Sequence, residues 1–153
     1  YSLFDGGTHV PLFVYWKGKV KPVVSDAPVC QIDLMASLAS MLGYQIPDGL
    51  DTQNHLDAFL GHSRKGRTDL VLEADGRLAY RTADWALIMP YKGKERNLTG
   101  NELGNLGEYG LFNLKSDRGQ QENLAKQHPD VVDKLLKQFL PIVEGYYPPA
   151  VKK

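Results

Sequence analysis

The sequence predicts an α/β fold in which a small antiparallel sheet of about four strands packs against a C-terminal helix. Three observations support this prediction. Short apolar segments separated by tight turns occupy residues 69–114, and a long apolar stripe follows near the C-terminus. An uninterrupted apolar segment near the N-terminus indicates one further strand, buried on both faces.

The N-terminal segment combines a turn with an apolar strand. Phe4-Asp5-Gly6-Gly7 has turn chemistry, because Asp can bond the backbone ahead of it and glycine accepts positive φ. Pro11 favours extended backbone in the residue before it. Leu12–Trp16 is apolar without alternation, which predicts a strand covered on both faces. The residues alone favour an ordinary turn and strand here over a ligand site.

A helix is predicted for residues 33–42. Asp33 is a good N-cap and Gly43 a good terminator. Five apolar side chains fall on one face, which we expect to be core. They are Leu34, Met35, Leu38, Met41 and Leu42. The basic segment 62–67 is interpreted as a surface loop.

Three strands are predicted next, at residues 69–73, 78–82 and 85–89. Asp75-Gly76 and Ala83-Asp84 separate them, so neighbouring strands should be antiparallel.

The polar segment 90–108 is predicted to be a long loop. Loops of this length are uncommon unless they are functional or mobile. It is interpreted either as a rim for substrate or as a surface hairpin, and its Asn97-Leu98-Thr99 is a formal glycosylation sequon. Residues 109–114 predict a fourth strand.

The C-terminal helix begins at His128-Pro129-Asp130, with proline in the first turn and an acid where the helix dipole favours it. Its apolar stripe is Val132, Leu135, Leu136, Phe139, Leu140 and Val143. Pro141 should kink or end the helix. Residues 145–153 predict a tail that either docks or frays.

Composition indicates a soluble globular protein. The 153 residues suit a single domain, with 42% apolar and 24% charged residues. Eighteen acidic residues balance eighteen basic ones, which argues against nucleic acid or an anionic membrane as partner. No apolar run approaches the ~20 residues of a membrane span. Tyr1 stands where a Met would start a chain, so we expect that an upstream piece has been removed.

The residues present show no complete catalytic or metal-binding motif. The four histidines, His9, His55, His62 and His128, share no ligand spacing, so no metal site is predicted. Cys30 is the single cysteine, cannot form an internal disulfide, and lacks a nearby base, so we interpret it as a small packing residue.

Four short segments, in the right order, resemble the type I sulfatases, an arylsulfatase-like family of the alkaline phosphatase superfamily. They are Phe4–Gly7 with Pro11–Trp16, Ile32–Leu34 with the helix after it, Leu78–Ile88, and Leu111–Leu114 with Asn123-Leu124. The resemblance spans Phe4 to about Leu140 and covers only the C-terminal portion of the family. Three residues depart from its pattern: Ala86 replaces a lysine, Arg118 a proline and Gln120 a glutamate.

The resemblance implies that the intact protein is a sulfuric ester hydrolase acting on an aryl or carbohydrate sulfate. The family's nucleophile is a formylglycine made from a Cys/Ser-x-Pro/Ala-x-Arg motif, with calcium beside it, and both lie upstream. Cys30-Gln31-Ile32-Asp33-Leu34 does not match that motif. A family lysine that contacts the sulfate would immediately precede Tyr1. The fragment alone is therefore predicted to be inactive, with no cofactor of its own.

The resemblance also implies a short helix at residues 56–60 and assigns regions and partners. Residues 1–61 would end the catalytic domain, with the terminal part of the large sulfatase sheet, and 62–153 would form the antiparallel-sheet subdomain. The chain would pack on the missing N-terminal portion, or self-associate through exposed apolar surface, and the protein would be periplasmic or secreted. His9 lies where family members carry Arg or His, and is a candidate to bind the sulfated small molecule or glycan.

Three other interpretations stay open at this stage. His9 could be an ordinary turn histidine bonded to backbone. The chain could be a non-catalytic carbohydrate-binding or interaction module with a sulfatase-like fold, or part of a related enzyme acting on phosphate esters.

Overall fold

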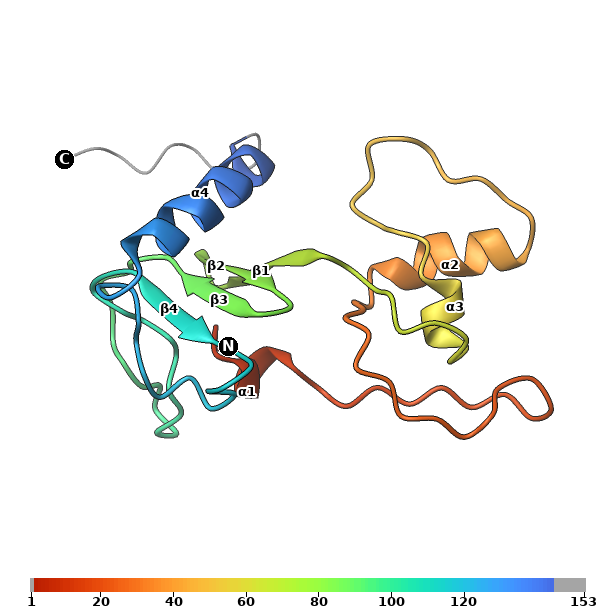
Figure 1. Ribbon diagram of the computed structural model, residues 1–153, viewed down its shortest axis with the longest axis horizontal. Helices are drawn as coiled ribbons and strands as arrows, with labels where there is room; N and C mark the ends of the chain where they lie inside the picture. The colour runs from red at the N-terminus through yellow and green to blue at the C-terminus, as the bar shows by residue number, and fades with distance from the viewer. Residues whose placement is uncertain (1, 145–153) are drawn as a thin grey trace. The chain divides into compact units, whose positions relative to one another are not determined.

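The computed structural model describes residues 2–144, which form two compact units (Figure 1). Of these residues, the first unit holds 2–10 and 69–144, and the second holds 11–68. The assignment of residues 1–61 and 62–153 to domains of a longer protein stays a prediction, and the predicted tail at 145–153 lies outside the described residues.

The first unit is built on an antiparallel sheet of four strands in the order β1-β2-β3-β4. The strands are β1 (Asp69–Ala74), β2 (Arg77–Thr82), β3 (Trp85–Ile88) and β4 (Gly110–Asn113). Asp75 and Gly76 join β1 to β2 with φ of 56° and 74°, the left-handed pair that matches the twist of a hairpin. The predicted strands, their antiparallel order and the hairpin turn are confirmed.

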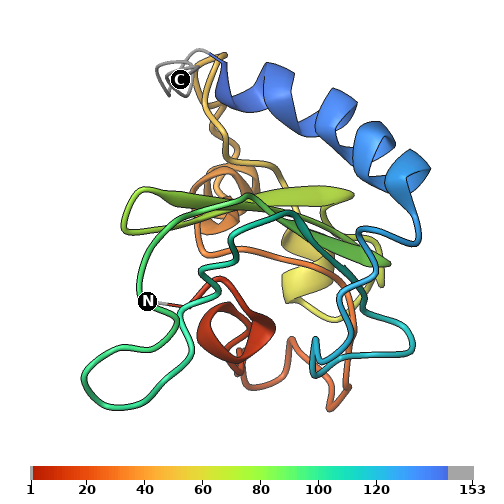
Figure 2. The same ribbon diagram turned by 90° about the vertical axis from the view of Figure 1, so that its left-hand side faces the viewer.

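Side chains alternate between the two faces of this sheet, and each face buries its own core. Tyr80, Leu87 and Leu111 pack under helix α4 (Pro129–Val143), whose Phe139 is fully buried. On the opposite face, the core groups Ala79, Ala86, Ile88 and Phe112 with the N-terminal Leu3. Figure 2 shows α4 on one side of the sheet and α1 on the other. The sheet is therefore the middle layer of this unit.

The predicted C-terminal helix is confirmed, with one correction. Pro129 occupies its first position, and the helix ends two residues after Pro141, as a late proline allows. Leu140 does not belong to the buried stripe, because it is 47% exposed.

The predicted turn at Phe4–Gly7 is a short helix, α1 (Asp5–Thr8). The N–H of Gly7 donates to the carbonyl of Phe4 at 2.8 Å, and that of His9 to the carbonyl of Asp5 at 2.7 Å. The two glycines do not prevent this single turn, because Leu3 before it is packed in the core of the sheet and Asp5 is paired with Arg81.

The second unit contains α2 (Asp33–Met41) and α3 (Leu56–Phe59), both predicted. The predicted core face of α2 is wrong, because Leu34, Met35, Leu38, Met41 and Leu42 are all exposed. The buried face carries Asp33, Ala36 and Ser37 instead. Arg67 also corrects the prediction of a surface loop at 62–67, because its guanidinium is buried against the Asp33 carboxylate.

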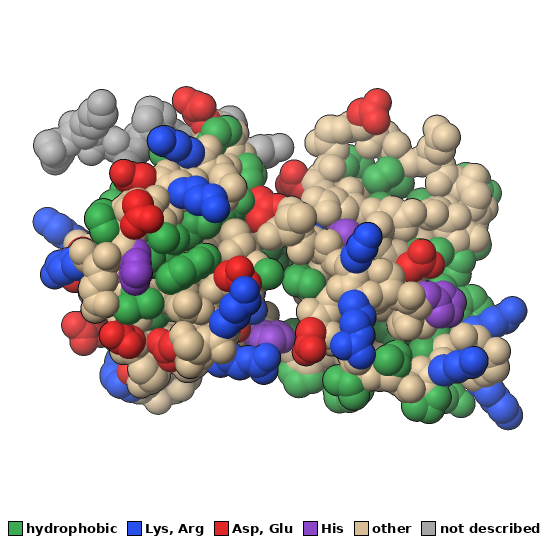
Figure 3. Space-filling model, in the orientation of Figure 1, with side chains coloured by type: hydrophobic (Ala, Val, Ile, Leu, Met, Phe, Trp, Pro, Cys, Tyr) green, Lys and Arg blue, Asp and Glu red, His purple; other side chains and the backbone are tan. Residues whose placement is uncertain are grey.

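The predicted buried strand at Leu12–Trp16 is also wrong for this structure. No residue of 11–68 forms a strand with it, and all five of its side chains are exposed, Phe13 by 90% and Tyr15 by 87%. A strand covered on both faces needs neighbouring strands for its backbone and apolar layers for its side chains. The second unit supplies neither neighbouring strands nor apolar layers for this segment. Figure 3 shows apolar side chains, in green, on the surface of both units.

Candidate functional site

The candidate site is centred on α1, which is held in place by two side chains from elsewhere in the first unit and contacted by the adjoining His9. The Asp5 carboxylate forms an ion pair with Arg81 of β2. Its second oxygen lies 3.3 Å from Nδ1 of His9, one helical turn later. The Asp5 backbone N–H donates to Oε1 of Gln120 at 2.6 Å. Residues far apart in sequence thus fix the segment in which the family resemblance is strongest.

Arg81 provides the buried charge of this arrangement. Its side chain is mostly buried, and burial lowers its pKa from the ordinary value. Arginine nevertheless stays protonated in proteins, so Asp5 faces a permanent positive charge. The pair therefore orients the Asp5 carboxylate, whose other oxygen is directed at His9.

His9 is the predicted substrate-binding residue. Its side chain is 69% exposed, and Asp5 is its hydrogen-bond partner among residues 2–144. When Nδ1 carries a proton and donates to Asp5, Nε2 remains available to a ligand at the surface. A role for His9 in binding substrate stays a prediction, and so does its interpretation as an ordinary turn histidine. Its backbone N–H donates to the Asp5 carbonyl, and its ring contacts the Asp5 carboxylate.

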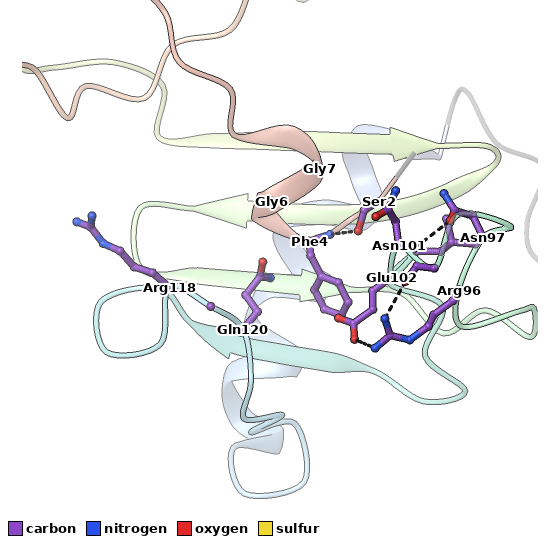
Figure 4. Close-up of a pocket in the computed structure, with 13 residues that line it drawn as sticks. Ser2, Phe4, Gly6, Gly7, Arg96, Asn97, Asn101, Glu102, Arg118 and Gln120 are labelled. Carbon is purple, nitrogen blue, oxygen red and sulfur yellow. Dashed lines mark hydrogen bonds and ion pairs between the residues drawn. The ribbon is translucent and has the colours of Figure 1, made fainter.

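A cavity of about 690 Å³ lies beside α1 (Figure 4). Three segments line it: the start of the chain, the loop 96–103 and the turn 118–120. Its polar side chains are Ser2, Arg96, Asn97, Asn101, Glu102, Arg118 and Gln120. Phe4 adds an aromatic ring, which also packs edge-on against Phe112 with the centroids 5.8 Å apart.

The loop that borders this cavity is fixed to the sheet by the buried Arg77. The guanidinium donates to the Leu103 carbonyl at 3.1 Å and to Oδ1 of Asn105 at 2.7 Å. The N–H of Leu3 donates to the same Leu103 carbonyl at 3.2 Å. The segment 90–108 contains a single isolated bridge, between Arg96 and Glu102. Hydrogen bonds from the Arg77 side chain thus hold the segment 90–108, in which strand pairing is sparse.

The other three histidines each lie beside a different residue of their own unit. His55 contacts Gln53, His62 lies 3.9 Å from Asp57, and the ring of His128 is 6.1 Å from that of Trp85. Within residues 2–144, no group of three or more His, Cys, Asp or Glu side chains is placed to hold a metal ion. Across the same residues, none of the helices has the length and apolar character needed to cross a membrane.

Sequence reasoning missed Arg81 and Gln120 as parts of this site. In the sequence, Arg81 stands out only as part of a predicted strand, and Gln120 only as a departure from the family pattern. The departure of Gln120 from the family's glutamate was the one signal that could have singled it out.

Comparison with known proteins identifies the chain's relatives. No protein-family model matches it. An N-acetylgalactosamine-6-O-sulfatase of Bacteroides thetaiotaomicron is 37% identical over 139 residues, which are 88% of this chain and 27% of that protein. Arylsulfatase A of Bos taurus is 27% identical, over 94% of this chain and 30% of its own length.

Solved structures agree with these relatives. A structure described under the metabolism of multiple glycosaminoglycans by Bacteroides thetaiotaomicron matches 93% of this chain with a TM-score of 0.87 and 35% identity. The chain covers 30% of that structure. It thus spans between a quarter and a third of the relatives that it matches.

These similarities first define a class, because both relatives are named as sulfatases. Within that class, the chain is homologous to the sulfatases, and the extent of the matches is consistent with a C-terminal portion of such a protein. The predicted resemblance and the predicted fold class are therefore confirmed.

Proposed function

We propose that this chain is the C-terminal portion of an enzyme that hydrolyses sulfate esters of carbohydrates. The observation that carries the proposal is the 37% identity to an N-acetylgalactosamine-6-O-sulfatase along 88% of the chain. The similarity includes the fold, with a TM-score of 0.87 to a structure from glycosaminoglycan metabolism. These relatives favour a sulfated sugar over an aryl sulfate as substrate.

In this proposal the chain supplies binding groups, and the rest of the enzyme supplies the reacting centre. By family resemblance, formylglycine and calcium would belong to the rest of the intact protein. His9 would offer its Nε2 to the sulfate ester, with its ring oriented by Asp5. The family lysine directly before Tyr1 would lie on the same segment.

The exposed apolar segment Leu12–Trp16 supports the proposal that the second unit packs against a further part of the protein. We propose that it packs on the N-terminal portion of the same enzyme, because five consecutive exposed apolar residues exceed what a free surface usually carries. By family resemblance the enzyme would be periplasmic or secreted.

Sulfate release by the intact protein tests the proposal. We expect the intact enzyme to release sulfate from 6-O-sulfated N-acetylgalactosamine, and to act poorly on the matched phosphate ester. The 153-residue chain should release none, with or without calcium. Sulfate release by the purified chain would contradict the predicted inactivity, and a preference for the phosphate ester would favour the related phosphatase.

The alternative, a non-catalytic carbohydrate-binding or interaction module, predicts different solution behaviour. A stand-alone module should be monomeric and should not bind a hydrophobic dye. The exposure of Leu12–Trp16 favours the interpretation that the chain is a portion of a larger enzyme.

A further inference from the structure

The amide of Gln120 is buried with its donor nitrogen unpaired by any described residue. The residue is only 6% exposed, and its Oε1 accepts the Asp5 N–H at 2.6 Å. Its Nε2 has no hydrogen-bond partner among residues 2–144. Buried polar groups in proteins are nearly always paired, so this donor needs a partner that the described residues do not supply.

The orientation of this amide is determined by its neighbour. Asp5 presents an N–H, which only an acceptor can meet, so Oε1 must face Asp5 and Nε2 must face away from it. Exchanging the two atoms would place two donors against each other. Gln120 also has a left-handed backbone, with φ of 51°, so its side chain leaves the 118–120 turn in an uncommon direction.

Gln120 lines the cavity beside α1, and Figure 4 shows its amide near the Phe4 ring. Two other side chains of the lining have unused polar atoms. Asn97 uses Oδ1 for three internal hydrogen bonds, which leaves its Nδ2 as a donor. Asn101 donates through Nδ2 to Thr99, which leaves its Oδ1 as an acceptor. The cavity thus offers amide donors, an amide acceptor and an aromatic ring.

The charges of the lining favour an uncharged ligand. Arg96 is neutralised by an ion pair with Glu102 and also donates to the Gly100 carbonyl at 2.8 Å. In Figure 4 the side chain of Arg118 extends away from Phe4 and Gln120. A site for a free anion would instead present unpaired guanidinium groups to the ligand.

We infer that this cavity binds an uncharged, hydroxylated sugar ring, with Nε2 of Gln120 donating to one of its oxygen atoms. The ring would be a part of the glycan that carries no sulfate. This inference deepens the proposed function, on which it rests for the class of substrate. It assigns Gln120, which stands where the family has glutamate, a part in choosing the sugar.

Two isosteric variants of the 153-residue chain test this assignment. Gln120→Glu keeps an oxygen for the Asp5 N–H but replaces the Nε2 donor by a second acceptor. Gln121→Glu makes the same charge change at the next residue, an exposed side chain whose Nε2 donates to the Gly119 carbonyl. The second variant is therefore the matched control.

The experiment titrates unsulfated N-acetylgalactosamine into each protein and follows the amide resonances by NMR. We expect saturable shifts around Leu103 and Gln120 in the original chain and in Gln121→Glu, and at least about tenfold weaker binding in Gln120→Glu, as the loss of one buried hydrogen bond implies. The Asp5 amide resonance reports whether α1 stays anchored. Asn101→Ala, which removes an acceptor from an exposed loop, should also weaken binding.

Equal binding by Gln120→Glu and the original chain would overturn the inference, as would the absence of saturable shifts in the original chain. The same shifts on adding sodium sulfate instead of sugar would show an anion site and would also overturn it. Because the probe carries no sulfate, failure here leaves the sulfate-release assay of the intact enzyme unaffected, and the two failures can be distinguished.

Discussion

Asp33 is expected to be the most sensitive position of the second unit. Its buried carboxylate accepts from Nε and Nη2 of Arg67 at 2.8 and 2.6 Å. It also accepts the backbone N–H groups of Cys30 at 3.1 Å and Gln53 at 3.0 Å. One side chain therefore ties the start of α2 to two segments that have no other regular structure.

Asp33→Asn should lower the free energy of unfolding of the second unit by about 3–5 kcal/mol, the usual cost of breaking a buried ion pair from one side. Asparagine has a single acceptor oxygen, whereas Arg67, Cys30 and Gln53 present four donors to this side chain. Its NH₂ group would also face one of these donors, and two donors cannot form a hydrogen bond. Arg67 would retain the Asp51 carbonyl, which it contacts at 2.5 Å, but would lose the Asp33 carboxylate. The buried guanidinium would then lack the negative charge of Asp33.

The same site predicts an acid-sensitive stability. Burial raises the pKa of Asp33, but hydrogen bonds from Arg67, Gln53 and Cys30 and the charge of Arg67 outweigh it, so the pKa lies below its ordinary value. A lowered pKa in the folded state stabilises the fold above the unfolded-state value of about 3.9. That stabilisation is lost as the pH falls through the folded-state pKa. The Asn variant should lack this part of the acid dependence.

Hydrogen exchange of the Cys30 and Gln53 amides measures both effects, because each amide donates to Asp33. We expect much faster exchange in Asp33→Asn. The control is Asp57→Asn, which removes an exposed carboxylate lying 3.9 Å from His62 and should change little. Unchanged protection of both amides in Asp33→Asn would refute the assigned role of the ion pair.

Three further predictions concern packing, backbone and surface. Phe139→Ala should lower the free energy of unfolding of the first unit by about 3–5 kcal/mol in urea denaturation, because the ring is fully buried; a change below about 1 kcal/mol would contradict that packing. Gly76→Ala should lower the free energy of unfolding of the first unit by about 1 kcal/mol, because φ is +74° at this position. Gly107→Ala should lower it less, because a Cβ there would meet open space and φ is not positive. Equal losses for the two variants would contradict the left-handed turn at Gly76. Phe13→Ser should reduce the binding of a hydrophobic dye, and Leu98→Ser, a single exposed residue of the other unit, should not; a chain that binds no dye at all would contradict the exposed apolar surface.

The sequence predicts the first unit well because its signals are local. Strand alternation and the Asp75-Gly76 turn specify the hairpin, and the 3.6-residue period places Phe139 inward. The second unit is predicted poorly. The helical period predicts the extent of α2 but not its buried face. That face is determined by the ion pair between Asp33 and Arg67, which lie 34 residues apart in the sequence.

The candidate site could be predicted only in part for the same reason. The segment around Asp5 and His9 is visible as a motif. Its anchors are not, because Arg81 is 76 residues from Asp5 and Gln120 is 115 residues from it. Nothing in the local pattern around either residue indicates a contact with the N-terminal segment.

The sequence of the parent gene immediately upstream of Tyr1 tests the central claim most directly. If this chain is the C-terminal portion of a working sulfatase, a Lys codon stands directly before Tyr1, and a Cys/Ser-x-Pro/Ala-x-Arg motif is encoded further upstream. A start codon or an unrelated domain at that place would contradict the claim, and would favour a binding module that keeps the fold without the chemistry.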